Sequence, residues 1–168
     1  VKINKSLLVI GGTGFIGSNL LKKAKKLGFS STSISLRKPN KKNFVPGVKY
    51  IMLDITKKEK LKKLKGNFHI IVNAGGYGGL DENFKNKNKM YKDQYDGLKN
   101  ISSHFLNKRI TKFVQIGSSL EYGKSKTPHK ENISIDKKTL KSTYSYSKYL
   151  ATKHLLSMYK RNKFPVTI

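Results

Sequence analysis

The feature that most constrains the fold of this chain is a glycine-rich turn at residues 11–17, placed between a strand pattern and a helix pattern. Residues 7–10 (Leu-Leu-Val-Ile) form a short apolar run, typical of a strand buried on both faces. From Phe15 onward, apolar residues recur at helical spacing. A helix that begins after bare glycines presents free amides and partial positive charge to an anion. In this context, Gly12-x-Gly14-x-x-Gly17 predicts a dinucleotide pyrophosphate site, with a purely structural turn as the alternative. The predicted cofactor contacts of the turn are Gly11, Gly12, Thr13, Gly14, Phe15, Ile16 and Gly17.

The rest of the chain alternates between strand and helix patterns. Parallel β-α-β units of this kind build a doubly wound parallel sheet, so the predicted fold class is α/β, an NAD(P)-binding Rossmann fold in one domain, 1–168. In the second strand, Ile34 and Leu36 are expected to point inward. Further strands are expected at 31–36, 48–53, 68–73, 110–116 and 164–168. Helices are expected at 57–64, from a start within 81–92 to about 107, and at 142–160.

The end of the second strand bears on the choice of cofactor. A carboxylate there would bind the ribose 2′-hydroxyl of NAD, but no acidic residue occurs between Gly11 and Asp54. Ser35, Arg37 and Lys38 stand in its place, and a hydroxyl with two cations suits a 2′-phosphate. NADP(H) is therefore favoured, with NAD(H) as the alternative.

The ends of the third and fourth strands provide further candidates. Asp54, followed by Ile55, either accepts a hydrogen bond from the adenine amino group or caps the next helix. Ala74 and Gly75 open a glycine-rich run to Gly79, where the cofactor could lie against bare backbone.

The net charge of +27 makes nucleic acid a candidate partner. Of the 36 basic residues, however, only Arg37, Arg109 and Arg161 are arginines, so 33 are lysines spread along every segment. Base and phosphate recognition favours the planar guanidinium, and nucleic-acid binding is therefore not the predicted main role. No apolar run could span a bilayer, no cysteine is present, and no metal site is predicted. These features predict a cytoplasmic protein.

A tyrosine and a lysine one helical turn apart can act together, because the ammonium favours the phenolate and lowers the pKa of the phenol. In so lysine-rich a chain the spacing Tyr-x-x-x-Lys has no weight alone, since it occurs five times where roughly two are expected by chance. The matches are Tyr95/Lys99, Tyr122/Lys126, Tyr144/Lys148, Tyr149/Lys153 and Tyr159/Lys163.

Longer motifs indicate which of these tyrosine–lysine pairs is the catalytic one. The chain resembles the extended short-chain dehydrogenase/reductase family, in its branch of nucleotide-sugar epimerases, dehydratases and reductases. The resemblance rests on residues 11–17, 54–55, 117–123 (Gly-Ser-Ser-Leu-Glu-Tyr-Gly) and 144–148 (Tyr-Ser-Tyr-Ser-Lys). It implies Tyr144 as catalytic base, Lys148 as its partner on the nicotinamide ribose, and Ser118 as the residue that orients a sugar hydroxyl. Tyr149/Lys153 is the rival pair.

The resemblance also narrows the reaction. Similar 4,6-dehydratases carry an acidic pair, or a Ser-Glu pair, directly after the catalytic Ser/Thr, where this chain has Ser119 and Leu120. Glu121 falls one place late, and either backbone or substrate is its partner. An epimerase or a 4-keto reductase is therefore favoured. The resemblance also implies a nucleotide-sugar substrate and a homodimer that pairs through the helices near Tyr95 and Tyr144.

The resemblance covers only the cofactor half of the family. We therefore expect the C-terminal substrate region of the family to be absent and the domain to be truncated in or after the sixth strand. These 168 residues alone are expected to show little or no turnover. The alternatives are a non-catalytic dinucleotide-binding or regulatory module and, less favoured, a charge-driven nucleic-acid binder.

Overall fold

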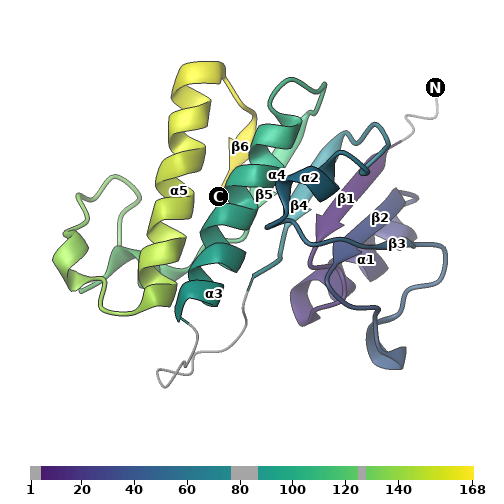
Figure 1. The fold of residues 1–168 in the computed structure, drawn as a ribbon, viewed down its shortest axis with the longest axis horizontal. Coiled ribbons are helices and arrows are strands. Elements are labelled where there is room, and N and C mark those ends of the chain that lie inside the picture. Colours follow the sequence, from purple (N-terminus) through teal and green to yellow (C-terminus); the bar gives the residue numbers. More distant parts are fainter. Residues whose placement is uncertain (1–4, 77–86, 125–127) are drawn as a thin grey trace.

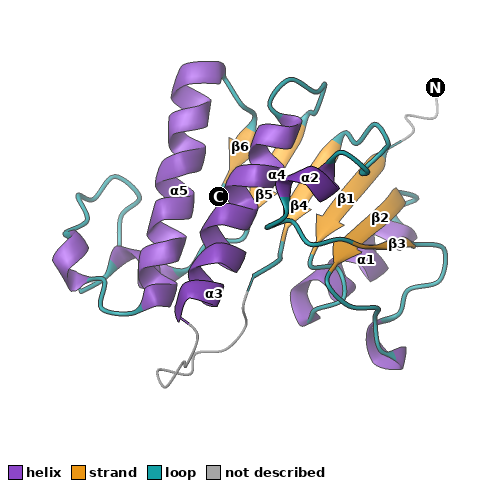
Figure 2. Ribbon diagram, viewed as in Figure 1, coloured by secondary structure: helices purple, strands orange, loops and turns teal. Residues whose placement is uncertain are grey.

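Six parallel strands form one sheet in the order β3-β2-β1-β4-β5-β6, with helices on both faces (Figures 1 and 2). The structure, a computed structural model, describes residues 5–76, 87–124 and 128–168. The predicted glycines Gly78 and Gly79, and Lys126 of one tyrosine–lysine pair, lie outside them. The strands are β1 Ser6–Ile10, β2 Ser30–Ser35, β3 Lys49–Met52, β4 Ile70–Asn73, β5 Lys112–Gln115 and β6 Val166–Thr167. The order confirms the predicted doubly wound sheet, whose direction of winding reverses between β1 and β4.

The helices follow the strands in alternation. They are α1 Phe15–Lys26, α2 Lys58–Leu61, α3 Lys87–Tyr91, α4 Gly97–Phe105 and α5 Thr143–Asn162. Short turns of other helical types are η1 Lys41–Asn43, η2 Lys92–Asp96, η3 Ser119–Tyr122 and η4 Lys137–Thr139. Within the described residues, no helix is both long enough and apolar enough to cross a bilayer.

Two apolar layers hold the helices to the sheet. Successive side chains of a strand point to opposite faces, so Leu7 and Val9 pack in the layer of α1. Leu8 and Ile10 pack in the other layer, which α2, α4 and α5 cover. Each of these four side chains is at most 4% exposed, which is why β1 reads as an unbroken apolar run.

One local expectation was wrong. Leu36 does not point inward: β2 ends at Ser35, and the Leu36 side chain beyond it is 58% exposed. The helix expected to start within residues 81–92 and to reach about 107 is found, with described helical residues from Lys87 to Phe105, and a π-helical turn, η2, lies within it before α4. The apolar stripe of α4 is as expected, with Leu98, Ile101 and Phe105 buried.

The strand register brings the functional loops to one edge of the sheet. Ile10 at the end of β1 lies opposite Ile34 in β2 and Asn73 in β4, and Asn73 lies opposite Gln115 in β5. The chain therefore leaves all four strands at nearly the same level. Ligands of doubly wound sheets bind at this carboxyl edge, beside the reversal point.

Candidate cofactor-binding and catalytic site

The glycine turn after β1 is built from close backbone contacts. Gly11 has a φ of +76°, which favours glycine, and a Cβ there would lie 2.7 Å from the Gly75 nitrogen. The Gly14 amide donates to the Gly11 carbonyl at 3.0 Å. A Cβ on Gly17 would lie 2.7 Å from the Gly12 Cα. These contacts hold the turn flat against the loop after β4, as expected for a surface that a ligand approaches closely.

Helix α1 begins from this turn without a side-chain cap. Gly14 is the N-cap residue and supplies no side-chain hydrogen bond, and no acidic residue occurs in the first helical turn. The first amides of a helix have no partner within the helix, and the helix dipole makes this end partially positive. The geometry therefore suits an anion such as a pyrophosphate.

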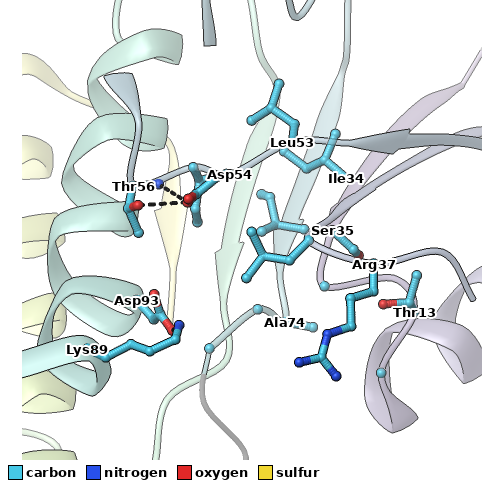
Figure 3. A pocket seen from close by; sticks show the side chains of 17 residues that line it. Thr13, Ile34, Ser35, Arg37, Leu53, Asp54, Thr56, Ala74, Lys89 and Asp93 are labelled. Carbon is cyan, nitrogen blue, oxygen red and sulfur yellow. Dashed lines mark hydrogen bonds and ion pairs between the residues drawn. The ribbon is translucent and has the colours of Figure 1, made fainter. Parts of the chain in front are cut away.

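A pocket of about 330 Å³ opens above this turn (Figure 3). It lies at the carboxyl edge of the four strands β1 to β4. Its lining includes nine of the predicted cofactor residues, namely Gly11, Thr13, Gly14, Ser35, Arg37, Asp54, Ile55, Ala74 and Gly75.

The other predicted cofactor residues do not line the pocket. Gly12 is buried, and a Cβ on it would lie 2.8 Å from Leu21 Cδ1, so its role is to let α1 pack closely on the sheet. Gly17 packs on the turn itself, as described above. Phe15 and Ile16 are exposed at the start of α1, and Lys38 is exposed beyond Arg37.

The wall at the end of β2 carries an orphaned hydroxyl and a cation. Ser35 Oγ is buried and has no hydrogen-bond partner among the described residues. Arg37 is exposed, and its guanidinium extends beside the pocket between Thr13 and Ala74 (Figure 3). A buried hydroxyl without a partner costs free energy, so a ligand that hydrogen-bonds Ser35 would remove that cost.

Asp54 closes a local turn at the end of β3. Its Oδ1 accepts from the Thr56 amide at 2.9 Å and from the Thr56 hydroxyl at 2.7 Å. Helix α2 begins four residues later, with Lys57 as its N-cap residue. Asp54 therefore does not cap that helix, and it lines the pocket as the first alternative requires.

An ion pair that no sequence pattern predicts forms the opposite wall. Lys89 Nζ lies 2.6 Å from Asp93 Oδ2, one turn along the α3–η2 segment, and both residues line the pocket (Figure 3). A lysine four residues from an acidic residue is common in so basic a sequence, so the spacing alone does not single out this pair. The tertiary fold brings the two side chains to the pocket. Gly76, from the predicted glycine-rich run, also lines the pocket. The remaining lining residues, which the motifs missed, are Ile10, Ile34, Leu36, Leu53 and Thr56.

The three predicted catalytic residues lie on β5's loop and on α5, outside the lining of this pocket. Lys148 is 6% exposed, and its Nζ donates to the Ile116 carbonyl at 2.8 Å. The same Nζ lies 5.8 Å from the centroid of the Tyr144 ring. Burial lowers the pKa of the Lys148 ammonium, and the Glu121 carboxylate partly opposes this by raising the pKa. The site therefore places an ammonium of lowered pKa beside a phenol ring, two groups that can take part in proton transfer.

Among the residues that the structure describes, Ser118 makes only local hydrogen bonds. It is the N-cap of η3, and its Oγ accepts from the Leu120 amide at 3.3 Å. The Tyr144 hydroxyl makes no hydrogen bond to the described part of the chain, and none joins it to Ser118. The structure therefore brings Lys148 to both the Tyr144 ring and the end of β5, and leaves the two hydroxyls unconnected to each other.

Comparison with known proteins agrees with this geometry. The family model described as "NAD dependent epimerase/dehydratase family" matches residues 7–168. The chain belongs to this family. Membership of the NAD-dependent epimerase/dehydratase family confirms the resemblance that the motifs at residues 11–17, 117–123 and 144–148 predicted.

Three proteins similar to this chain, one found by sequence and two by structure, agree with the family. The ADP-L-glycero-D-manno-heptose-6-epimerase of Brachyspira hyodysenteriae is 27% identical over 169 residues, covering 94% of this chain and 50% of that protein. The UDP-Glc/GlcNAc 4-epimerase of Campylobacter jejuni superposes with a TM-score of 0.85 at 22% identity, covering 96% of this chain and 51% of that chain. The Bordetella bronchiseptica enzyme WbmF, solved with NAD⁺, has a TM-score of 0.77 at 21% identity, with 97% and 48% covered. The chain thus spans about half the length of these relatives.

Proposed function

We propose that this chain is the cofactor-binding and catalytic half of an NAD(P)-dependent nucleotide-sugar epimerase or 4-keto reductase. The observation that carries the proposal is the pocket itself: a bare glycine turn at an uncapped helix start forms one side, and an orphaned hydroxyl beside an arginine forms another. Supporting it, WbmF was solved with NAD⁺, and the Campylobacter relative is a UDP-sugar 4-epimerase.

The pocket residues fit a dinucleotide on their chemistry. The amides at the start of α1 would hold the pyrophosphate, and the bare backbone at Gly11 and Gly75 would let it approach. Asp54 would accept from the adenine amino group, and Ser35 would bind the adenosine ribose or its phosphate. When bound, the nicotinamide ring supplies hydride transfer to or from the sugar.

The catalytic roles follow the family resemblance. Tyr144 would take or return the proton of a sugar hydroxyl, and Ser118 would orient that hydroxyl. Lys148 would hold the nicotinamide ribose and stabilise the phenolate, for which its position 5.8 Å from the Tyr144 ring centroid is suitable. A nucleotide-sugar substrate and a homodimer belong to the same proposal.

We propose NADP(H) as the preferred cofactor, with NAD(H) as the alternative. Arg37 lines the pocket beside Ser35, and no acidic residue precedes Asp54 to bind a 2′-hydroxyl. One relative, WbmF, was solved both with NAD⁺ and with NADH, which favours the alternative. The side chains of this chain, not its fold, therefore support NADP(H).

One observation favours a second candidate, a non-catalytic dinucleotide-binding module. The Ser118 hydroxyl is hydrogen-bonded within its own loop and not to Tyr144. A regulatory module would need the pocket but not the serine–tyrosine pair.

Parallel titrations with NADPH and NADH test the cofactor proposal, followed by the Arg37→Ala variant. If Arg37 binds the 2′-phosphate, NADPH affinity falls about tenfold, worth about 1.4 kcal/mol, while NADH affinity stays the same. Arg161→Ala, which removes the same charge from the exposed end of α5, is the matched control. An equal loss for both cofactors would contradict NADP(H) specificity.

Tyr144→Phe in the full-length protein separates the two candidate functions, since an enzyme loses turnover and a regulatory module keeps its function.

A further inference from the structure

Glu121 is a buried acid for which the proposed reaction has no use. It lies in η3 and is 6% exposed. Its Oε1 accepts from the Ser118 amide at 2.9 Å, and its Oε2 accepts a short hydrogen bond from the Thr152 hydroxyl. Of the two partners that the sequence left open, the structure therefore gives Glu121 the backbone, together with a residue of α5.

The two hydrogen bonds join the elements that carry the predicted catalytic residues. Ser118 is on the loop after β5, and Thr152 is on α5. Lys148 lies four residues before Thr152, so both side chains lie on one face of that helix. Lys148 makes a second link to the same loop segment through the Ile116 carbonyl. Two side chains, one from each element, thus tie the segment 116–121 to one face of α5.

The packing around the carboxylate leaves it little freedom. A Cβ on Gly117 would lie 2.8 Å from Glu121 Oε1, so the absence of a side chain there lets the carboxylate reach the Ser118 amide. Burying a carboxylate costs several kcal/mol unless hydrogen bonds compensate it, and bonds to an ionised acceptor are the stronger kind. The negative charge also favours the charged form of Lys148, against the larger opposing effect of burial.

We propose that Glu121 is a positioning residue of this site, which fixes the Ser118 loop against the face of α5 that carries Lys148. The inference rests on the proposed function for its catalytic consequence. Glu121 does not contact substrate in this role: it acts by keeping Ser118 at a constant position relative to α5.

Amide hydrogen exchange of the whole chain, followed by NMR, tests the link. In Glu121→Val, the Ser118 amide loses its acceptor and should exchange about tenfold faster, with amides of β1 and α1 unchanged. Glu121→Gln keeps an oxygen for that amide and should stay within about threefold of the native rate. Glu59→Gln, at an exposed site on α2, is the control.

Thr152 provides a test that leaves the buried carboxylate in place. Thr152→Val preserves shape but removes the hydroxyl, and should speed exchange across residues 117–123, whereas Thr152→Ser should restore the native rates. These two Thr152 variants test the link between the Ser118 loop and α5 even if Glu121→Val does not fold.

The pKa of Lys148, followed by NMR of its side chain, supplies a readout that a merely structural contact would not move. In Glu121→Gln the pKa of Lys148 should fall further, because the carboxylate that raises it is gone. Unchanged exchange at Ser118 in both Glu121→Val and Thr152→Val, or an unchanged Lys148 titration in Glu121→Gln, would overturn the inference. NADH titration of the unaltered protein tests only the proposed function, so the two can fail separately.

Discussion

Replacement of Gly14 by alanine should separate ligand binding from folding. Gly14 has φ −82° and ψ 179°, a conformation that any residue adopts, and it is the N-cap of α1. The nearest atom to a Cβ there is the Gly11 carbonyl oxygen at 3.4 Å, an ordinary contact. Alanine is a somewhat poorer N-cap than glycine, so the free energy of unfolding should fall by no more than about 1 kcal/mol.

The same methyl group should obstruct the cofactor. It would stand on the surface that the proposed pyrophosphate must approach, in front of the amides that begin α1. We expect NADH affinity to fall by about tenfold or more, which corresponds to about 1.4 kcal/mol. NADH fluorescence titration measures the affinity, and urea unfolding measures the stability of the same samples.

Gly17→Ala is the matched comparison, with the same added methyl group three residues later. There the Cβ would lie 2.7 Å from the Gly12 Cα and closer still to the Gly11 carbonyl oxygen. These are backbone atoms, so the turn must distort, and overpacking of this kind costs roughly 1–3 kcal/mol. The helix propensity of alanine, worth about 1 kcal/mol over glycine, offsets only part of that cost. If Gly14→Ala binds NADH with the native affinity, the pyrophosphate does not lie at this turn and the reasoning fails.

Two further predictions concern stability. Burial, reinforced by Lys99, lowers the pKa of His154, so its contribution to stability is complete above the unfolded pKa of about 6.5 and is lost as the pH falls through the folded value. Urea unfolding from pH 7.5 downward should therefore show declining stability below about pH 6.5, less steeply in His154→Gln; an identical slope would contradict this. Asn73→Ala should cost roughly 1–3 kcal/mol, because it leaves the buried Gln115 side-chain oxygen without its 2.8 Å partner. The exposed control Asn107→Ala should change the unfolding free energy by less than about 0.5 kcal/mol, and an equally small effect at Asn73 would refute the importance of that hydrogen bond.

The parts of the fold that the sequence predicts are those governed by local rules. The apolar run of β1, the glycine spacing and the helical stripe of α4 each depend on neighbouring residues, and each was found as expected. Leu36 was assigned wrongly because alternation shows which face a strand residue takes but not where the strand stops.

The parts that the sequence does not predict depend on distant contacts. Nothing local distinguishes Lys89 and Asp93 from other charged pairs in the chain, since only the packing of α3 beside the sheet brings them to the pocket. The partner of Glu121 was likewise undecidable, because Thr152 lies 31 residues away and reaches it only through the docking of α5. The motif at 11–17 therefore predicts the part of the pocket that this one loop forms. The rest of the pocket lining comes from other strands and helices, whose packing the sequence pattern does not show.

The crossing of the loops after β1 and β4 has a consequence for how such a protein tolerates change. Where Gly11 lies against Gly75, two main-chain segments meet at the floor of the pocket with no side chain between them. Lysines can therefore coat the exterior to a net charge of +27 without altering the chemistry offered at that floor. The bias in composition and the shape of this backbone floor therefore depend on different residues, so the surface can change while the floor stays the same.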